Sequence, residues 1–81
     1  MSKIQKLYER MKNNPHGDWR IEDVEKLASA YGFSWNEGKG SHKNFYHQNL
    51  PHILTIPCKR PIKPLYIKKL LELIEQIEGQ K

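Results

Sequence analysis

The sequence predicts an α+β fold with the element order α-α-β-β-β-α in a single domain of 81 residues. Three observations support this prediction. Two short segments at the start of the chain space their apolar residues as helices do, the middle of the chain alternates apolar and polar residues, and a longer helical pattern closes it. Because short turns join the alternating segments, we expect a three-stranded antiparallel sheet with the helices on one face.

The first two helices are separated by a loop that contains Pro15. The first is expected from Ser2 to Lys12, where apolar residues recur at i, i+3, i+4 and i+7. The second is expected from Ile21 to Tyr31, and Gly32 follows at the position that favours a left-handed residue after a helix. Asp18 is the nearest candidate for the N-terminal cap of the second helix.

Three strands and a last helix are expected in the rest of the chain. The first strand is predicted over residues 33–36, the second over His42–Gln48 and the third over Ile53–Ile56. Turns at 38–41 and 49–51 join them. A basic loop then leads to Pro64, which suits the first turn of a helix, and this helix is expected to end near Gly79.

The positive charge of the chain lies in its middle. The formal net charge is +5, and the stretch from Gly38 to Leu71 holds seven basic residues and no acidic one. Such a zone attracts polyanions and favours a nucleic-acid partner. A domain of this size leaves little room for a large enclosed pocket, so a polymer bound on an open surface is expected rather than a small metabolite. The seven residues are Lys39, Lys43, Lys59, Arg60, Lys63, Lys68 and Lys69.

The remaining composition indicates a cytoplasmic protein. Cys58 is the only cysteine, which excludes an internal disulfide and suits a reducing compartment. No apolar run is long enough to span a membrane, and the first residues lack the apolar centre of a signal peptide. We therefore expect no membrane partner.

His42 is the strongest candidate for chemistry. If Phe45 points into the core, alternation along the strand places His42, Asn44 and Tyr46 on the opposite, open face of the sheet. An exposed imidazole beside lysines is well placed to meet a phosphate, and Tyr46 is expected either to stack on a base or to be an ordinary half-buried aromatic. The candidate phosphate contacts are Lys39, Lys43, Lys59, Arg60 and Lys63.

The motif Gly40-Ser41-His42, three residues before Phe45, together with Ile56-Pro57 after the third strand, resembles the HicA family of toxins. The resemblance covers about residues 21–77. It implies a fold like that of double-stranded-RNA-binding domains in residues 20–79, with residues 1–19 as an N-terminal helical extension. It also implies a toxin that cleaves mRNA with His42 as the catalytic residue, RNA contacts at Gly40 and Ser41, and a HicB-like antitoxin as partner. The proline-rich loop before the last helix departs from the family pattern.

The chemistry expected of His42 needs no cofactor. RNA carries its own nucleophile, the 2′-hydroxyl, and a histidine can move the proton. A zinc site is not expected, because His42, His47, His52 and Cys58 are five or six residues apart rather than in close pairs, and only one thiolate is present.

Two other functions remain open. The same fold could bind RNA without cutting it, with His42 as one more contact. Alternatively, the first helix could dock on a protein partner, although packing on its own core is the simpler role for its apolar face. Direct DNA binding is not expected, because the first two helices are separated by a Pro-Gly loop and are followed by strands rather than by a recognition helix.

Overall fold

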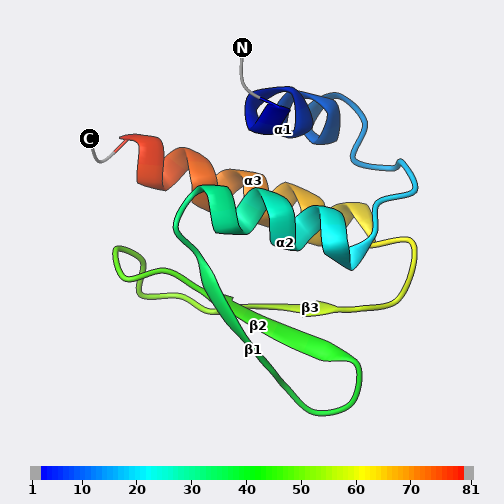
Figure 1. Cartoon of the computed structure of the whole chain (residues 1–81), viewed down its shortest axis with the longest axis vertical. Helices are drawn as coiled ribbons and strands as arrows, with labels where there is room; N and C mark the ends of the chain where they lie inside the picture. Colours follow the sequence, from blue (N-terminus) through cyan, green and yellow to red (C-terminus); the bar gives the residue numbers. More distant parts are fainter. Residues whose placement is uncertain (1–2, 80–81) are drawn as a thin grey trace.

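The computed structural model describes residues 3–79 and confirms the predicted element order (Figure 1). The predicted α+β class and the antiparallel sheet are confirmed as well. The part of the first predicted helix at Ser2 lies outside the described residues. The elements are α1 (Lys3–Asn13), α2 (Ile21–Ala30), β1 (Ser34–Glu37), β2 (His42–Tyr46), β3 (Leu54–Pro57) and α3 (Pro64–Gly79).

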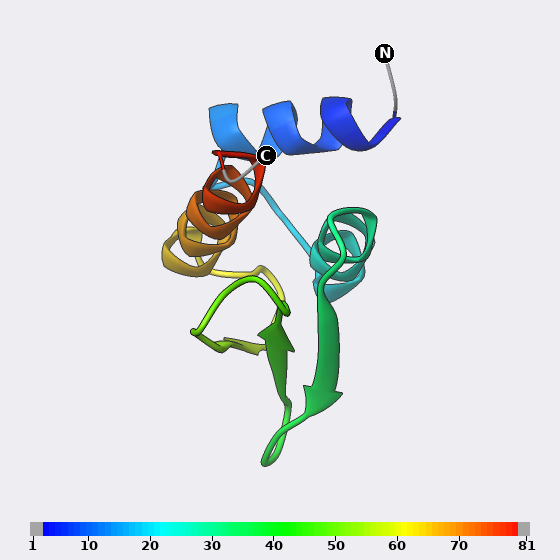
Figure 2. The same cartoon turned by 90° about the vertical axis from the view of Figure 1, so that its left-hand side faces the viewer.

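The elements form three layers. The sheet has the strand order β1-β2-β3, and both strand pairs are antiparallel. Helices α2 and α3 lie side by side over one face of the sheet, and α1 crosses them on the side away from the sheet (Figure 2). No helix among the described residues covers the other face of the sheet.

Strand alternation decides which side chains enter the core. Phe45 of β2 is fully buried, and its register partners Trp35 and Leu54 pack with it on the helix-covered face. The rings of Trp35 and Phe45 are 5.3 Å apart. Since neighbouring residues of a strand point to opposite faces, residues 42, 44 and 46 are directed to the uncovered face. From here on we call that side the outer face.

Helix α2 begins differently from the prediction. Its N-cap is Arg20, whose backbone N–H donates to the Asp23 carboxylate at 3.0 Å. The expectation that Asp18 caps this helix is wrong, because the Asp18 carboxylate instead accepts hydrogen bonds from Arg60.

The end of α2 agrees with the prediction. Gly32 has φ +85°, and its N–H donates to the Ser29 carbonyl, while the Phe33 N–H donates to the Ala28 carbonyl. These two bonds form a Schellman motif, which satisfies the last carbonyls of the helix and turns the chain into β1.

The second strand is shorter than predicted because the chain turns inward after Tyr46. The His47 ring is buried, its Nε2–H donates to the Tyr31 carbonyl at 3.1 Å, and its Nδ1 accepts from the Asn49 N–H at 3.0 Å. Both ring nitrogens are thereby satisfied in the neutral form. The third strand begins one residue later than predicted, and Ile53 is 66% exposed.

The N-terminal helix packs on the rest of the chain. Met11 is fully buried, and Ile4, Leu7 and Tyr8 lie against the core. This finding supports the simpler of the two roles considered for the apolar face of the helix.

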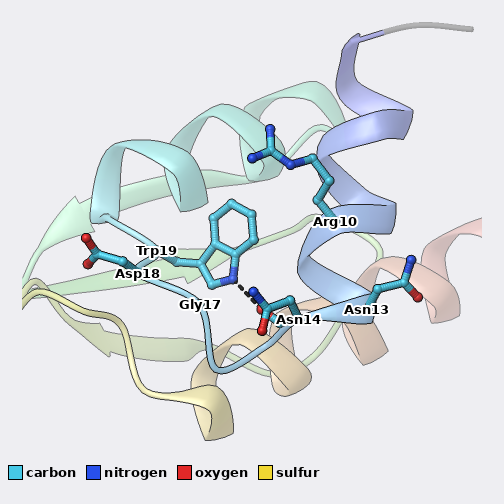
Figure 3. A pocket seen from close by; sticks show the side chains of 6 residues that line it. All are labelled: Arg10, Asn13, Asn14, Gly17, Asp18 and Trp19. Carbon is cyan, nitrogen blue, oxygen red and sulfur yellow. Dashed lines mark hydrogen bonds between the residues drawn. The ribbon is translucent and has the colours of Figure 1, made fainter.

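The linker that follows α1 is anchored at its far end by Trp19. The Trp19 indole is buried and donates a hydrogen bond to the Asn14 carbonyl at 2.8 Å, beside a hollow of about 360 Å³ (Figure 3). The Arg10 guanidinium lies 5.8 Å from the centre of the indole ring. The linker is thus held against both α1 and the core.

None of the helices in the described part of the chain combines the length and the apolarity that crossing a bilayer demands.

We expect Gly32→Ala to lower the free energy of unfolding by about 1–2 kcal/mol. A side chain at φ +85° is strained, and the added Cβ would lie 3.2 Å from His47 Nε2. Urea denaturation followed by circular dichroism measures the change. Gly79→Ala is the matched control, since its Cβ would meet no atom within 4 Å. Equal stability of the two variants would contradict the expectation.

We expect Met11→Ala to lower the free energy of unfolding by about 2–5 kcal/mol, the usual cost of a cavity in a core. If the helix only rested on the surface, the same substitution would lower the free energy of unfolding far less. Thermal and urea unfolding of the full chain measure the effect, with Lys12→Ala on the exposed side of the same helix as the control.

Candidate functional site

His42 is the first residue of β2 and is exposed on the outer face, as the alternation from Phe45 predicts. The turn before it is closed by a hydrogen bond from the Gly38 N–H to the His42 carbonyl at 2.8 Å. Gly40 has φ +65° in this turn, a conformation that residues with a side chain rarely adopt. The imidazole therefore lies at the mouth of a tight, glycine-dependent turn.

One backbone contact fixes the protonation pattern of the His42 ring. Nδ1 lies 3.0 Å from the carbonyl oxygen of Lys39. A carbonyl can only accept a hydrogen bond, so Nδ1 must carry the proton in this contact. In the neutral ring, Nε2 then keeps its lone pair. This is the arrangement that a general base requires.

A chain of polar side chains crosses the outer face next to His42. Asn44 Nδ2 donates to Asn36 Oδ1 at 3.1 Å, and Thr55 Oγ1 donates to Asn44 Oδ1 at 2.8 Å. These three residues come from β1, β2 and β3 and are cross-strand neighbours in the sheet. Sequence reasoning placed Asn44 on this face but missed Asn36 and Thr55 as part of the surface. The register of the strands, which the sequence alone does not give, connects them.

The loop after β3 lies directly beside His42. Pro57 is the register partner of His42 on β3, and the Cys58 N–H donates to the Ser41 carbonyl at 2.6 Å. Paired residues of antiparallel strands have Cα atoms about 4.5–5.5 Å apart. Ser41 and the start of the basic loop therefore lie close to His42. The turn keeps Gly40 close to His42 as well.

A groove of about 470 Å³ follows this loop, and we call it the basic groove. Its lining includes Lys59, Arg60 and Lys63, three of the phosphate contacts expected from the sequence, and Pro57 at the edge next to His42. The structure thus gathers these three basic side chains around one groove, and Pro57, the cross-strand partner of His42, lines the same groove.

Arg60 is oriented by a carboxylate from the α1–α2 linker. Its Nε donates to Asp18 Oδ1 at 3.0 Å and to Oδ2 at 3.1 Å, and Nη2 also donates to Oδ2. These bonds lower the pKa of Asp18 and raise that of Arg60. Both side chains are more than half exposed, so the pair matters here for the direction of the guanidinium rather than for stability.

Lys43 lies on the other side of the sheet from His42. Its Nζ forms a hydrogen-bonded ion pair with the Glu25 carboxylate on α2, and both side chains are 22% exposed. The hydrogen bond to Glu25 raises the pKa of Lys43. The structure does not bring this lysine to the outer face, although it is adjacent to His42 in the sequence.

The other expected contacts remain exposed. Lys39 lies in the turn before His42, and Tyr46 is 40% exposed on the outer face. Tyr46 is four residues from His42, which is about 13 Å along the strand. A base stacked on Tyr46 would therefore belong to a different nucleotide from the one at His42.

Cys58 is half-buried, and burial raises the pKa of its thiol, which disfavours the reactive thiolate. Among residues 3–79, no group of three or more His, Cys, Asp or Glu side chains is placed to hold a metal ion.

The family of the chain follows from a comparison with protein-family models. The model described as the HicA toxin of bacterial toxin–antitoxin matches residues 21–77, which is more than half of the chain. The chain belongs to the HicA toxin family. Comparison with curated proteins and with solved structures found no match.

The part that matches the HicA family runs from the start of α2 to the last turns of α3. It includes the whole sheet, the Gly40-Ser41-His42 turn and the loop that carries the basic groove. Helix α1 and the linker with Asp18 lie before it, so the partner of Arg60 is a feature of this HicA chain outside the matched region.

We expect Lys43→Met to lower the free energy of unfolding near neutral pH by up to about 1 kcal/mol. A lysine whose folded pKa is raised adds stability that is fully present below its unfolded pKa of about 10.4 and is lost as the pH rises through the folded value. The difference from wild type should therefore shrink above about pH 10.4. Urea denaturation across this range, with Lys68→Met as the control, measures it; a difference independent of pH would count against the ion pair.

Proposed function

We propose that this HicA-family chain is an endoribonuclease toxin that cleaves mRNA in the cytoplasm without a metal ion, with His42 as its catalytic residue. One observation carries the proposal. The exposed His42 ring is held by the Lys39 carbonyl through Nδ1, which leaves Nε2 as the basic nitrogen. The family match adds that the chain is of a toxin family.

The proposed reaction is an internal transfer within the RNA backbone. His42 Nε2 accepts the proton of a 2′-hydroxyl, whose oxygen attacks the adjacent phosphorus while the bond to the 5′ oxygen breaks. The leaving oxygen takes up a proton from the imidazolium or from water. The products carry a 2′,3′-cyclic phosphate and a 5′-hydroxyl. The reaction uses only atoms of the RNA, the histidine and water.

Basic side chains near His42 support this reaction by offsetting the charge that develops on the phosphate. Lys39 is exposed in the adjoining turn, and Lys59, Arg60 and Lys63 line the basic groove beside Pro57. We propose these four as phosphate contacts, with the backbone of Gly40 and Ser41 close to the RNA. Lys43 is left out, because Glu25 holds its Nζ on the opposite side of the sheet.

Tyr46 extends the proposed RNA surface along β2. Its exposed ring offers a stacking platform, and the polar Asn36–Asn44–Thr55 chain lies between it and His42. The amide and hydroxyl groups of these three side chains can hydrogen-bond to the 2′-hydroxyls and base edges of RNA.

The antitoxin partner is proposed to be HicB-like and to cover the outer face. A partner over His42 and the basic groove would block RNA from both at once. The net charge of +5 favours a partner surface that is acidic.

We expect wild type to cleave a long RNA in EDTA and His42→Ala to lose the activity by about 10²–10⁴-fold, because the proton acceptor is removed. Mapping of the new ends should give 5′-hydroxyls. His52→Ala is the control and should cleave as wild type does, since this exposed imidazole lies in the β2–β3 connection, at the other end of β2 from His42.

A different result would support the second candidate. If wild type and His42→Ala bind RNA equally and neither cuts it, the chain is a non-catalytic RNA-binding module. Retained cleavage in His42→Ala would place the catalytic group elsewhere.

A further inference from the structure

The basic groove is lined by both basic and apolar side chains. Beside Lys59, Arg60 and Lys63, its lining includes Tyr66 and the ring of Pro57. Two further prolines and the buried Ile62 complete the apolar part. Its volume of about 470 Å³ lies within the range of roughly 300–1,000 Å³ seen for small-ligand sites.

The groove borders the strand pair that carries His42. Pro57 belongs to both surfaces, since it pairs with His42 in the sheet and lines the groove. An RNA strand with a phosphate at His42 would bring a neighbouring nucleotide over Pro57 if it ran toward the groove. The aromatic ring of Tyr66 and the apolar ring of Pro57 suit the face of a nucleobase, and lysine and arginine suit the phosphate that follows it.

The α1–α2 linker forms the remaining wall. His16 of this linker lines the groove, and Asp18 holds one edge of the Arg60 guanidinium. A guanidinium has five N–H donors, and Asp18 engages only Nε and Nη2, so the other edge remains for a ligand. The linker thus contributes one side chain to the groove and directs another.

Hydrogen bonds at Trp19 hold the linker in place beside the groove. The Ile62 N–H donates to the Trp19 carbonyl at 2.8 Å, which ties the groove loop to the linker. The Trp19 indole is in turn bonded to Asn14, and a Cβ on Gly17 would lie 2.9 Å from Asn14 Nδ2, so the turn between them is tight (Figure 3).

We propose that the basic groove is a subsite for one nucleotide of single-stranded RNA next to the scissile phosphate, with its base on Pro57 and Tyr66 and its phosphate at Arg60 and Lys63. His16 of the N-terminal segment, outside the family match, contacts this nucleotide, and Asp18 is a positioning residue for Arg60. The inference rests on the proposed RNA substrate and adds where its neighbouring nucleotide binds.

The test measures binding separately from cleavage. The full chain with His42→Ala is titrated with a fluorescein-labelled hexaribonucleotide over a series of salt concentrations, and anisotropy gives Kd. Arg60→Ala should weaken binding about tenfold, the effect of losing one charged hydrogen bond. Lys63→Ala should also reduce the slope of log K against log salt by about 0.7, the value for one phosphate contact on a single strand. Lys68→Ala removes the same charge from the exposed side of α3 and should leave the slope unchanged.

Asp18→Asn separates positioning from net charge. The substitution makes the protein more positive by one charge, so general electrostatics alone would tighten RNA binding. If Asp18 directs Arg60, binding weakens instead. Tighter binding by Asp18→Asn would overturn the positioning role, and equal effects of Lys63→Ala and Lys68→Ala would overturn the subsite.

The histidine rings give a direct readout of the subsite. In NMR spectra of the His42→Ala protein, the imidazole signals of His16 should shift as RNA is added, whereas those of His52, which lines a different hollow, should not. Unchanged His16 signals at saturating RNA would overturn its contact. Capture of a glutamate-rich peptide by the groove, with RNA binding independent of Lys63, would assign the groove to a protein partner and overturn the RNA subsite.

The two proposals fail in different ways. If wild type cleaves RNA through His42 and the groove variants bind as Lys68→Ala does, the subsite fails and the ribonuclease proposal stands. If the groove variants weaken RNA binding and wild type cuts nothing, the subsite stands in an RNA-binding module and the catalytic proposal fails.

Discussion

The burial of Phe45 against the helices is the constraint on which the rest of the molecule depends. Phe45 lies in the central strand, and its two register partners pack on the same side. Because side chains alternate along a strand, this one placement sends His42 and Asn44 to the outer face. A register slip of one residue would exchange the two faces and bury the imidazole. The chemistry of the outer face is therefore fixed by the packing of the inner one.

Much of this arrangement could be predicted from the sequence, because the patterns concerned are local. Periodicity placed every helix and strand within one or two residues, apart from the inward turn at His47, and it placed His42 on the open face. Partners on other elements could not be predicted. Lys43 pairs with Glu25 on α2, and Arg60 pairs with Asp18, which lies 42 residues away. The periodicity of apolar residues shows which face of an element a side chain occupies. Its partner on another element depends on how the elements pack, and a local sequence pattern does not predict that packing.

The N-terminal segment lies before the residues that match the HicA family model, and it packs as part of the same fold. Helix α1 covers α2 and α3 from the side opposite the sheet, and Met11 completes the core there. The linker then runs to the start of α2, where the Trp19 carbonyl accepts a hydrogen bond from the Ile62 N–H. The same segment thus contributes to stability through its helix and borders the basic groove through its linker.

The contact between His42 and the Lys39 carbonyl has a consequence for genetics. The group that orients the imidazole belongs to the main chain, so no side-chain replacement removes it. A mutational scan would register Lys39 only through its ammonium charge and would not reveal the contact between its carbonyl and His42. This contact would become visible only through changes to the main chain itself, such as a substitution at Gly40 or an ester in place of the amide. If substitutions at position 39 are tolerated, the reason would be that the main-chain carbonyl, and not the side chain, contacts His42.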